Sequence, residues 1–198
     1  MISKLSNKAA NCFFKQSNIT DDELELYKYG FFILFSQILY LIIAIIIGIL
    51  FRTILESIIF YIAFQFIRRY AGGYHASTET RCEILSTLSI LACIVAIKFL
   101  KIYDFQAVLL MISAVSAVCI LFLCPLDTPE KPLSEKEFKY FRKVSWLILF
   151  VIVIAIAVSY ICKFNIVTAP CCLSLILESI LLVAGKIKKV SQKNNVKT

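Results

Sequence analysis

The amino-acid sequence predicts an all-α integral membrane protein, with about six transmembrane helices and an amphipathic N-terminal surface helix. Of its 198 residues, 60% are hydrophobic and only 17% are charged, whereas the surface of a soluble domain needs considerably more charge. The mean hydropathy is +0.85. Several apolar runs also approach the ~20 residues that a helix needs to cross a bilayer. Together these observations predict one membrane domain over residues 1–198.

Residues 1–29 are expected to form an amphipathic segment ahead of the membrane. Thr20 and Glu23 have the spacing of a capping box, so we expect the first spanning helix to begin well before its apolar run. Further upstream, apolar residues recur at helical spacing and the lysines lie mostly around the other face, which is typical of a helix on the inner membrane surface. The alternative is a frayed terminus. The apolar set is Ile2, Leu5, Ala9, Cys12 and Phe13.

Residues 30–185 are expected to form a helical membrane bundle. One of its apolar runs is short and contains Glu56 and Gln65, so it either spans with help from its neighbours or re-enters the membrane. Three prolines follow the fourth run and exclude a regular helix there. Ser134 with Glu137 repeats the capping-box spacing, so we expect the proline-rich loop to lead into an amphipathic turn before Trp146. The six runs are 31–50, 54–67, 84–100, 105–123, 146–162 and 166–184.

The basic residues indicate how the chain is oriented in the membrane. The net charge is +8. If six spans place both ends on one side, nearly all lysines and arginines fall on that side, which places it in the cytoplasm. Residues 186–198 then form a basic cytoplasmic tail. The charge is explained by topology and by contact with lipid headgroups, so nucleic-acid binding is not needed to explain it. The basic residues on the opposite side are Arg52, Lys98, Lys101 and Lys163.

The cysteines do not predict a metal site. There are eight, with no CxxC pair and no metal-type spacing to the lone histidine, so neither a metal nor another cofactor is expected. Most of them lie within the apolar runs, where cysteine usually serves as a small apolar residue. A bridge between Cys162 and Cys171 or Cys172 near the outer face is an alternative for those thiols.

One polar interruption, FIRRYAGGYHASTETRCE at residues 66–83, gathers the chain's reactive side chains. Thr80 and Glu83 have capping-box spacing, so Thr80 is the expected N-cap of the third span. Cys82 then falls in the first helical turn, where the positive end of the dipole favours a thiolate. His75, the only histidine, has the right chemistry for a general base and later a general acid.

The spacing adds a constraint on this pair. In one straight helix His75 and Cys82 would lie roughly 10 Å apart along the axis, which is too far for a hydrogen bond. The pair therefore requires a loop that folds His75 back, and Gly72 with Gly73 offers the bend. The alternative is an interfacial histidine beside an inert cysteine.

Two motifs carry a resemblance to a known family. RRYAGGYHASTETRC at 68–82 and CPLDTPEKPL at 124–133 resemble the signatures of the accessory gene regulator B (AgrB) family, bacterial membrane peptidases of quorum sensing. The resemblance covers essentially the whole chain. It implies a cysteine endopeptidase (a thiol protease, hence a hydrolase) of the bacterial cell membrane, with Cys82 and His75 catalytic on the cytoplasmic side. It also implies a homodimer.

The resemblance further implies a reaction and a partner. The substrate would be an AgrD-type pro-peptide, cleaved before its acidic C-terminal tail through a thioester on Cys82. A cysteine or serine of the precursor would then capture the acyl group and close a thiolactone or lactone ring, giving the autoinducing peptide.

Other roles at this site are expected with open alternatives. Arg68, Arg69, Gly72 and Gly73 are assigned to substrate positioning or to the oxyanion, and the alternative for the arginines is a topology anchor. Lys131 is assigned to contact with the acidic tail of the precursor. The alternative is that Lys131 serves only membrane topology, which explains a lysine in this loop nearly as well. For Glu178, snorkelling or pairing with a tail lysine is expected. As an ionisable group within the last span, Glu178 is also a site hypothesis by default. The candidates for a third catalytic residue, which would orient the imidazole, are Ser77, Thr78, Glu79 and Asp127.

A different class of function is a small membrane transporter or exporter of a peptide or other cargo. Glu56, Gln65 and Glu178 supply polar groups within the apolar runs. Carriers typically have paired broken helices and symmetry between their two halves. The sequence shows no paired broken helices and no obvious symmetry between its halves. Cleavage is therefore the favoured interpretation.

Overall fold

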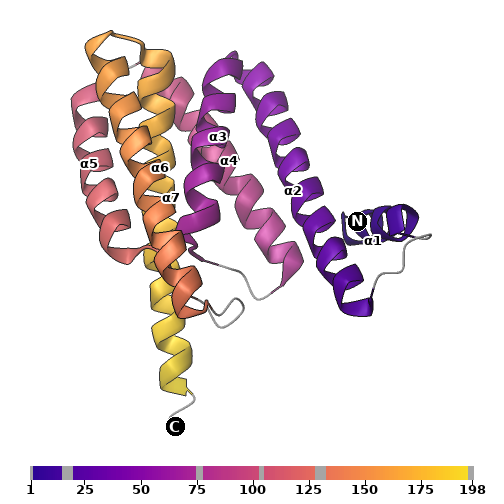
Figure 1. The fold of residues 1–198 in the computed structure, drawn as a ribbon. Coiled ribbons are helices and arrows are strands. Elements are labelled where there is room, and N and C mark those ends of the chain that lie inside the picture. The colour runs from indigo at the N-terminus through magenta and orange to yellow at the C-terminus, as the bar shows by residue number, and fades with distance from the viewer. Residues whose placement is uncertain (1, 15–19, 75–77, 103–104, 128–132, 196–198) are drawn as a thin grey trace. The chain divides into compact units, whose positions relative to one another are not determined.

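The computed structural model describes residues 2–14, 20–74, 78–102, 105–127 and 133–195, and these ranges are helical apart from short connections. The predicted all-α class is confirmed (Figure 1). Within the described residues the only β-type pairing is an isolated bridge between Gly72 and Leu126. The helices are α1 (Ile2–Phe14), α2 (Asp21–Phe51), α3 (Ile54–Ala71), α4 (Glu79–Ile102), α5 (Gln106–Leu123), α6 (Glu135–Ile161) and α7 (Asn165–Asn195).

The chain divides into two compact units, and the first is Met1–Ile43. It holds α1 and most of α2. The capping box at the start of α2 is present, because the Thr20 backbone N–H donates to Glu23 Oε2 at 3.0 Å and the Glu23 N–H donates to Thr20 Oγ1 at 3.4 Å. As expected, α2 begins before its apolar run. The helical form of α1 is confirmed, and its attachment to a membrane surface stays a prediction.

The second unit, Ala44–Thr198, contains the end of α2 and helices α3 to α7. Helix α7 packs against α3, α4, α5 and α6, and it lies among them in Figure 1. Its middle is buried on nearly every side, as expected for a helix that is apolar all round. The largest fully buried apolar side chains of this core include Phe60, Ile67, Ile94, Ile120, Leu175 and Leu182.

Within the described residues, five helices are long and apolar enough to cross a membrane by length and composition, which indicates a multi-pass membrane protein. Helix α3 corresponds to the short apolar run of the sequence, and at 18 residues it is as long as α5. It differs in carrying Glu56, Arg68 and Arg69, and it packs against α6 and α7 in the bundle. The sidedness of the bundle stays a prediction. The five spans are Glu23–Phe51, Arg81–Lys101, Gln106–Leu123, Glu135–Ile161 and Asn165–Ser191.

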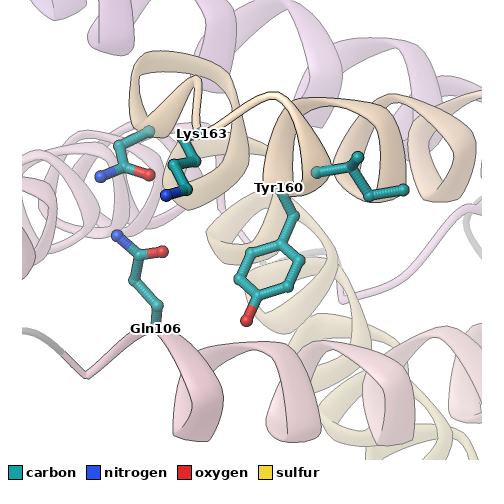
Figure 2. A pocket seen from close by; sticks show the side chains of 5 residues that line it. Gln106, Tyr160 and Lys163 are labelled. Carbon is teal, nitrogen blue, oxygen red and sulfur yellow. The ribbon is translucent and has the colours of Figure 1, made fainter.

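One end of the bundle carries a cavity of about 420 Å³, where α6 ends and α5 and α7 begin. Figure 2 shows Gln106, Tyr160 and Lys163 around it, and Ile161 and Asn165 complete the lining. Asn165 lines the cavity, whereas Gly185, further along α7, packs against Gly73 and Tyr74. At ~1.5 Å per residue these two positions of α7 lie roughly 30 Å apart along the helix axis. The cavity is therefore at the opposite end of the bundle from the segment that precedes His75.

Candidate functional site

The chain turns sharply after α3 at the glycine pair that the sequence singles out. Gly72 is the C-cap of α3, with φ of 79° and its N–H donating to Arg68 O at 3.2 Å, and Gly73 has φ of 130°. Such positive φ values favour glycine. A Cβ at Gly72 would also lie 2.8 Å from the Leu126 carbonyl oxygen. The predicted bend is present, and we call residues 72–74 the Gly–Gly segment.

Arg68 holds the carbonyl groups of this segment. Its Nη1 donates to Gly72 O and its Nη2 donates to Tyr74 O. A Cβ at Gly73 would overlap the guanidinium, so Gly73 leaves the space that Arg68 occupies. Arg69, in contrast, is exposed and its guanidinium lies 5.9 Å from the centre of the Tyr70 ring. The two neighbouring arginines therefore have different surroundings.

Helix α7 contacts the same segment from the other side. The Tyr74 N–H donates to Leu181 O at 2.9 Å. A Cβ at Gly185 would lie 2.9 Å from Gly73 C and from Tyr74 N, so the absence of a side chain there lets two backbones pack directly. Glu178 Oε1 lies 4.0 Å from Arg68 Nη1.

The loop after α5 forms a third contact. The Leu126 N–H donates to Ala71 O at 2.9 Å, and Asp127 pairs with Lys189 of α7 at 3.4 Å.

The expectation that Glu178 snorkels or pairs with a tail lysine is wrong. Glu178 is fully buried and faces Arg68, because α3 and α7 pack directly together, and the tail lysine pairs with Asp127 instead.

Cys82 lies in the first turn of α4, as expected, but the cap differs from the expected one. The Arg81 N–H donates to Thr78 Oγ1 at 3.4 Å, and the Cys82 N–H donates to Thr78 O at 3.1 Å. Thr78 is thus the N-cap and Thr80 is inside the helix, so the assignment to Thr80 was wrong. Either threonine suits the cap position chemically, and starting at Thr78 places the acidic Glu79 in the first turn, where the dipole favours it. The Cys82 side chain is half-buried.

Several predicted site residues lie outside the described residues, namely His75, Ser77 and Lys131. The side chain of Glu79 is outside them as well. Of the other candidates for a third catalytic residue, Thr78 is used as a helix cap. The pairing of His75 with Cys82 therefore stays a prediction.

A second thiol, Cys124, lies two residues before Leu126, which pairs with Gly72, but it differs from Cys82 in its surroundings. It is 3% exposed, next to the loop that carries Leu126. Burial raises the pKa of the Cys124 thiol, and the charge of Arg142 opposes this only in part. A buried neutral thiol is a poor nucleophile, so Cys82 is the better candidate of the two. Cys162, Cys171 and Cys172 are free thiols. Among the described residues no group of three His, Cys, Asp or Glu side chains has a metal-binding arrangement.

Two residues of this site, Leu181 and Gly185, were missed from the sequence. Leu181 acts through its backbone carbonyl, which leaves no trace in a sequence. Gly185 does leave a signal: it is a lone glycine inside an otherwise helical pattern, and small residues in membrane helices mark places where backbones approach closely.

Comparisons with known proteins place the chain in a family. The model of accessory gene regulator B (AgrB) matches residues 6–182. An AgrB-like protein of Clostridium perfringens (strain SM101 / Type A) is 28% identical over 172 residues, covering 83% of this chain and 80% of its own. Accessory gene regulator protein B of Staphylococcus aureus (strain MW2) is 26% identical over 150 residues, covering 74% and 79%.

A third relative, protein FsrB of Enterococcus faecalis (strain ATCC 47077 / OG1RF), is 28% identical over 123 residues, covering 60% of this chain and 49% of its own. No solved structure matches the chain. Because the family match covers most of the sequence and includes the Gly–Gly segment and Cys82, the chain belongs to the accessory gene regulator B family.

Proposed function

We propose that this protein is a membrane cysteine endopeptidase that cleaves the C-terminal tail from an AgrD-type pro-peptide and promotes closure of a thiolactone or lactone ring. Its family takes part in accessory gene regulator quorum sensing, with a role toward an AgrD- or FsrD-type peptide. The observation that carries the proposal is a half-buried thiol, Cys82, in the first turn of α4, following a glycine segment held by two helices.

The reaction needs a nucleophile and a base. The Cys82 sulfur attacks the carbonyl carbon of the scissile peptide bond and gives its proton to His75. As the C–N bond breaks, the imidazole returns the proton to the leaving amine, and the tail departs from a thioester on Cys82. A thiol or hydroxyl of the precursor then attacks the thioester. It closes the ring, and its proton restores the Cys82 thiol.

The start of α4 supports this role for Cys82. A helix N-terminus presents free backbone N–H groups and a positive dipole end. In this turn Thr78 caps the Arg81 N–H and accepts from the Cys82 N–H. The N–H groups of Glu79 and Thr80 therefore remain the nearest backbone candidates to stabilise the oxyanion.

Arg68 supports the reaction indirectly in this proposal. Its guanidinium donates to Gly72 O and Tyr74 O, so it positions the segment before His75 and does not itself touch the substrate. Lys131, in the proline-rich loop, is proposed to meet the acidic tail of the precursor. Arg69 is exposed and serves as a topology anchor.

The site is proposed to face the cytoplasm, with the protein acting as a homodimer among membrane lipids and without a cofactor. The end of the bundle that carries the Gly–Gly segment also carries the C-terminal part of α7 (Figure 1). That part includes Lys186, Lys188 and Lys189, and the positive-inside rule places such a cluster in the cytoplasm.

The test is cleavage of a co-expressed or purified pro-peptide by single variants. Cys82→Ala and His75→Ala are expected to abolish cleavage while protein amount and membrane insertion stay unchanged, with the shortened peptide and the released tail followed by mass spectrometry. Cys162→Ala is the matched control, because Cys162 is an exposed free thiol at the C-terminal end of α6, beside the cavity at the opposite end of the bundle from the Gly–Gly segment. Cleavage by the Cys82→Ala variant at the wild-type rate would overturn the proposal.

Reconstituted liposomes separate this function from an exporter. A peptidase produces the shortened peptide even in detergent micelles, where no compartment exists. A carrier moves intact peptide across sealed vesicles without cutting it. Movement without cleavage would favour the transporter.

A further inference from the structure

Glu178 is an ionisable side chain in the middle of a buried helix surface. It is 0% exposed, and among the described residues neither of its carboxylate oxygens has a hydrogen-bond partner. The charged group that faces it is Arg68, whose Nη1 lies 4.0 Å from Glu178 Oε1. A buried carboxylate is costly unless a charge compensates it, so this pair requires a reason beyond packing.

Arg68 connects this carboxylate to the Gly–Gly segment. The same Nη1 that faces Glu178 donates to Gly72 O, and Nη2 donates to Tyr74 O. A guanidinium is planar, with its donors in a fixed fork. An anion on one side of the fork therefore influences where its other donors lie. The carboxylate of Glu178 thus acts on the backbone through one intervening side chain.

The position of Glu178 on α7 is shared with the other contacts of that helix. Leu181 and Gly185 follow at three and seven residues, which places all three on one face. Leu181 O accepts from the Tyr74 N–H, and Gly185 packs against the Gly73–Tyr74 peptide. One face of α7 therefore sets the path of three consecutive residues, 72–74.

We propose that Glu178 is a positioning residue for the peptidase: through Arg68 it holds the Gly–Gly segment, and hence the chain that leads directly into His75, in the arrangement that cleavage requires. This inference rests on the proposed function. Glu178 touches neither the substrate nor the reacting atoms. Its effect is on the backbone of residues 72–74, which lead to the base, so its loss lowers the rate of the chemical step rather than the binding of the peptide.

The chain supplies a matched pair at the other end of the bundle. Glu56 of α3 is buried and pairs with Lys101 of α4, whose side chain is 42% exposed. That pair also links two helices through a buried carboxylate. It lies at the start of α3, whereas the Gly–Gly segment follows the end of α3. A purely structural role for buried ion pairs predicts similar consequences when either pair is removed.

The experiment measures kcat and KM for pro-peptide cleavage, together with thermal unfolding, for Glu178→Gln, Glu178→Asp and Glu56→Gln. For Glu178→Gln we expect kcat to fall on the order of 10- to 100-fold, as for a misplacement of up to ~1 Å, with KM within about twofold of wild type. Glu178→Asp keeps the charge and should retain more activity than Glu178→Gln. Glu56→Gln should change the unfolding temperature but leave kcat unchanged for the folded protein.

A neutral double variant keeps the inference testable where a lone buried Arg68 prevents folding. Arg68→Met with Glu178→Met removes both charges, so the unfolding temperature should recover while kcat stays low, because methionine cannot donate to Gly72 O and Tyr74 O. Amide exchange at Tyr74, measured by mass spectrometry, should be faster in this variant and in Glu178→Gln than in wild type or Glu56→Gln.

Wild-type kcat in the folded double variant would overturn the inference, and so would an equal loss of kcat in Glu56→Gln. Neither result affects the proposed function, which depends on Cys82→Ala. If Cys82→Ala abolishes cleavage and the Glu178 variants do not reduce it, only the positioning role fails. If Cys82→Ala cleaves normally, the peptidase itself is refuted.

Discussion

Replacing Gly185 by alanine tests directly whether close packing against α7 holds the Gly–Gly segment. A Cβ at this position would lie 2.9 Å from Gly73 C and 2.9 Å from Tyr74 N. Both are backbone atoms, so they cannot turn away as the end of a side chain can. The segment must therefore shift away from α7, and the hydrogen bond from Tyr74 N–H to Leu181 O, now 2.9 Å, must lengthen or break.

The expected loss of stability follows from three contributions. Glycine to alanine inside a helix gains about 1 kcal/mol from helix propensity. Overpacking of a tight contact costs about 1–3 kcal/mol, and losing the backbone hydrogen bond of Tyr74 costs about 0.5–1.5 kcal/mol. With the propensity gain subtracted, the net result is a destabilisation of about 0.5–3.5 kcal/mol. Cleavage should fall ~10- to 100-fold, because the chain that enters His75 is displaced.

Gly30→Ala is the matched control. Gly30 is also inside a helix, but no atom of the described part of the chain lies within 4 Å of the position where its Cβ would be built. This variant should be as stable as wild type or more stable by up to about 1 kcal/mol, with unchanged cleavage. The assay is thermal unfolding in detergent together with the rate of pro-peptide cleavage per folded molecule. If Gly185→Ala cleaves at the wild-type rate and unfolds no earlier than Gly30→Ala, the reasoning is refuted.

Three further predictions concern other parts of the bundle. Gly48→Ala brings a Cβ within 2.8 Å of Ser57 Oγ, so it should lower the free energy of unfolding by about 1–3 kcal/mol, measured by thermal unfolding. Gly48 is remote from the Gly–Gly segment, so a large loss of cleavage per folded molecule would contradict this reasoning. Lys189→Met removes the half-exposed pair with Asp127, so stability should fall by at most about 1 kcal/mol, and a difference that persists in high salt would argue against an ion pair. Burial raises the pKa of Cys124, so the folded state keeps the neutral thiol while the unfolded chain ionises first. This stability is fully present below the ordinary thiol pKa of ~8.5 and is lost as pH rises beyond it, so the unfolding temperature should fall more steeply there in wild type than in Cys124→Ala, and parallel curves would contradict this.

The helices and their starts could be predicted from the sequence because their causes are local. Apolar runs predict the spans, and capping-box spacing predicts the starts of α2 and α6, where the Thr20 and Ser134 boxes are both present. The bend at Gly72 and Gly73 could also be predicted, since positive φ favours glycine. At α4 the spacing of Thr80 and Glu83 predicted the wrong cap, because Thr78 takes the cap position and the helix begins at Glu79.

The contacts that position the site could not be predicted in the same way. The pairing of Arg68 with Glu178 joins residues far apart in the chain, and hydropathy does not say which helix packs against which. Charge patterns indicated a tail lysine as the partner of Glu178, but the packing of α3 on α7 places Glu178 out of reach of solvent. The position of Cys82 in the first turn of α4 was predicted correctly, because a helix start is set by nearby residues, and its role as a nucleophile stays a prediction.

The order of synthesis gives the packing of α7 one more consequence. Leu181, Gly185 and Glu178 emerge from the ribosome after α3 to α6, whereas His75 and Cys82, the proposed catalytic pair, precede them. A growing chain therefore carries both residues before it has the helix that packs against the Gly–Gly segment, which precedes the histidine. Under the proposed function, cleavage therefore requires α7, and we expect chains that terminate before this helix to leave the pro-peptide uncut.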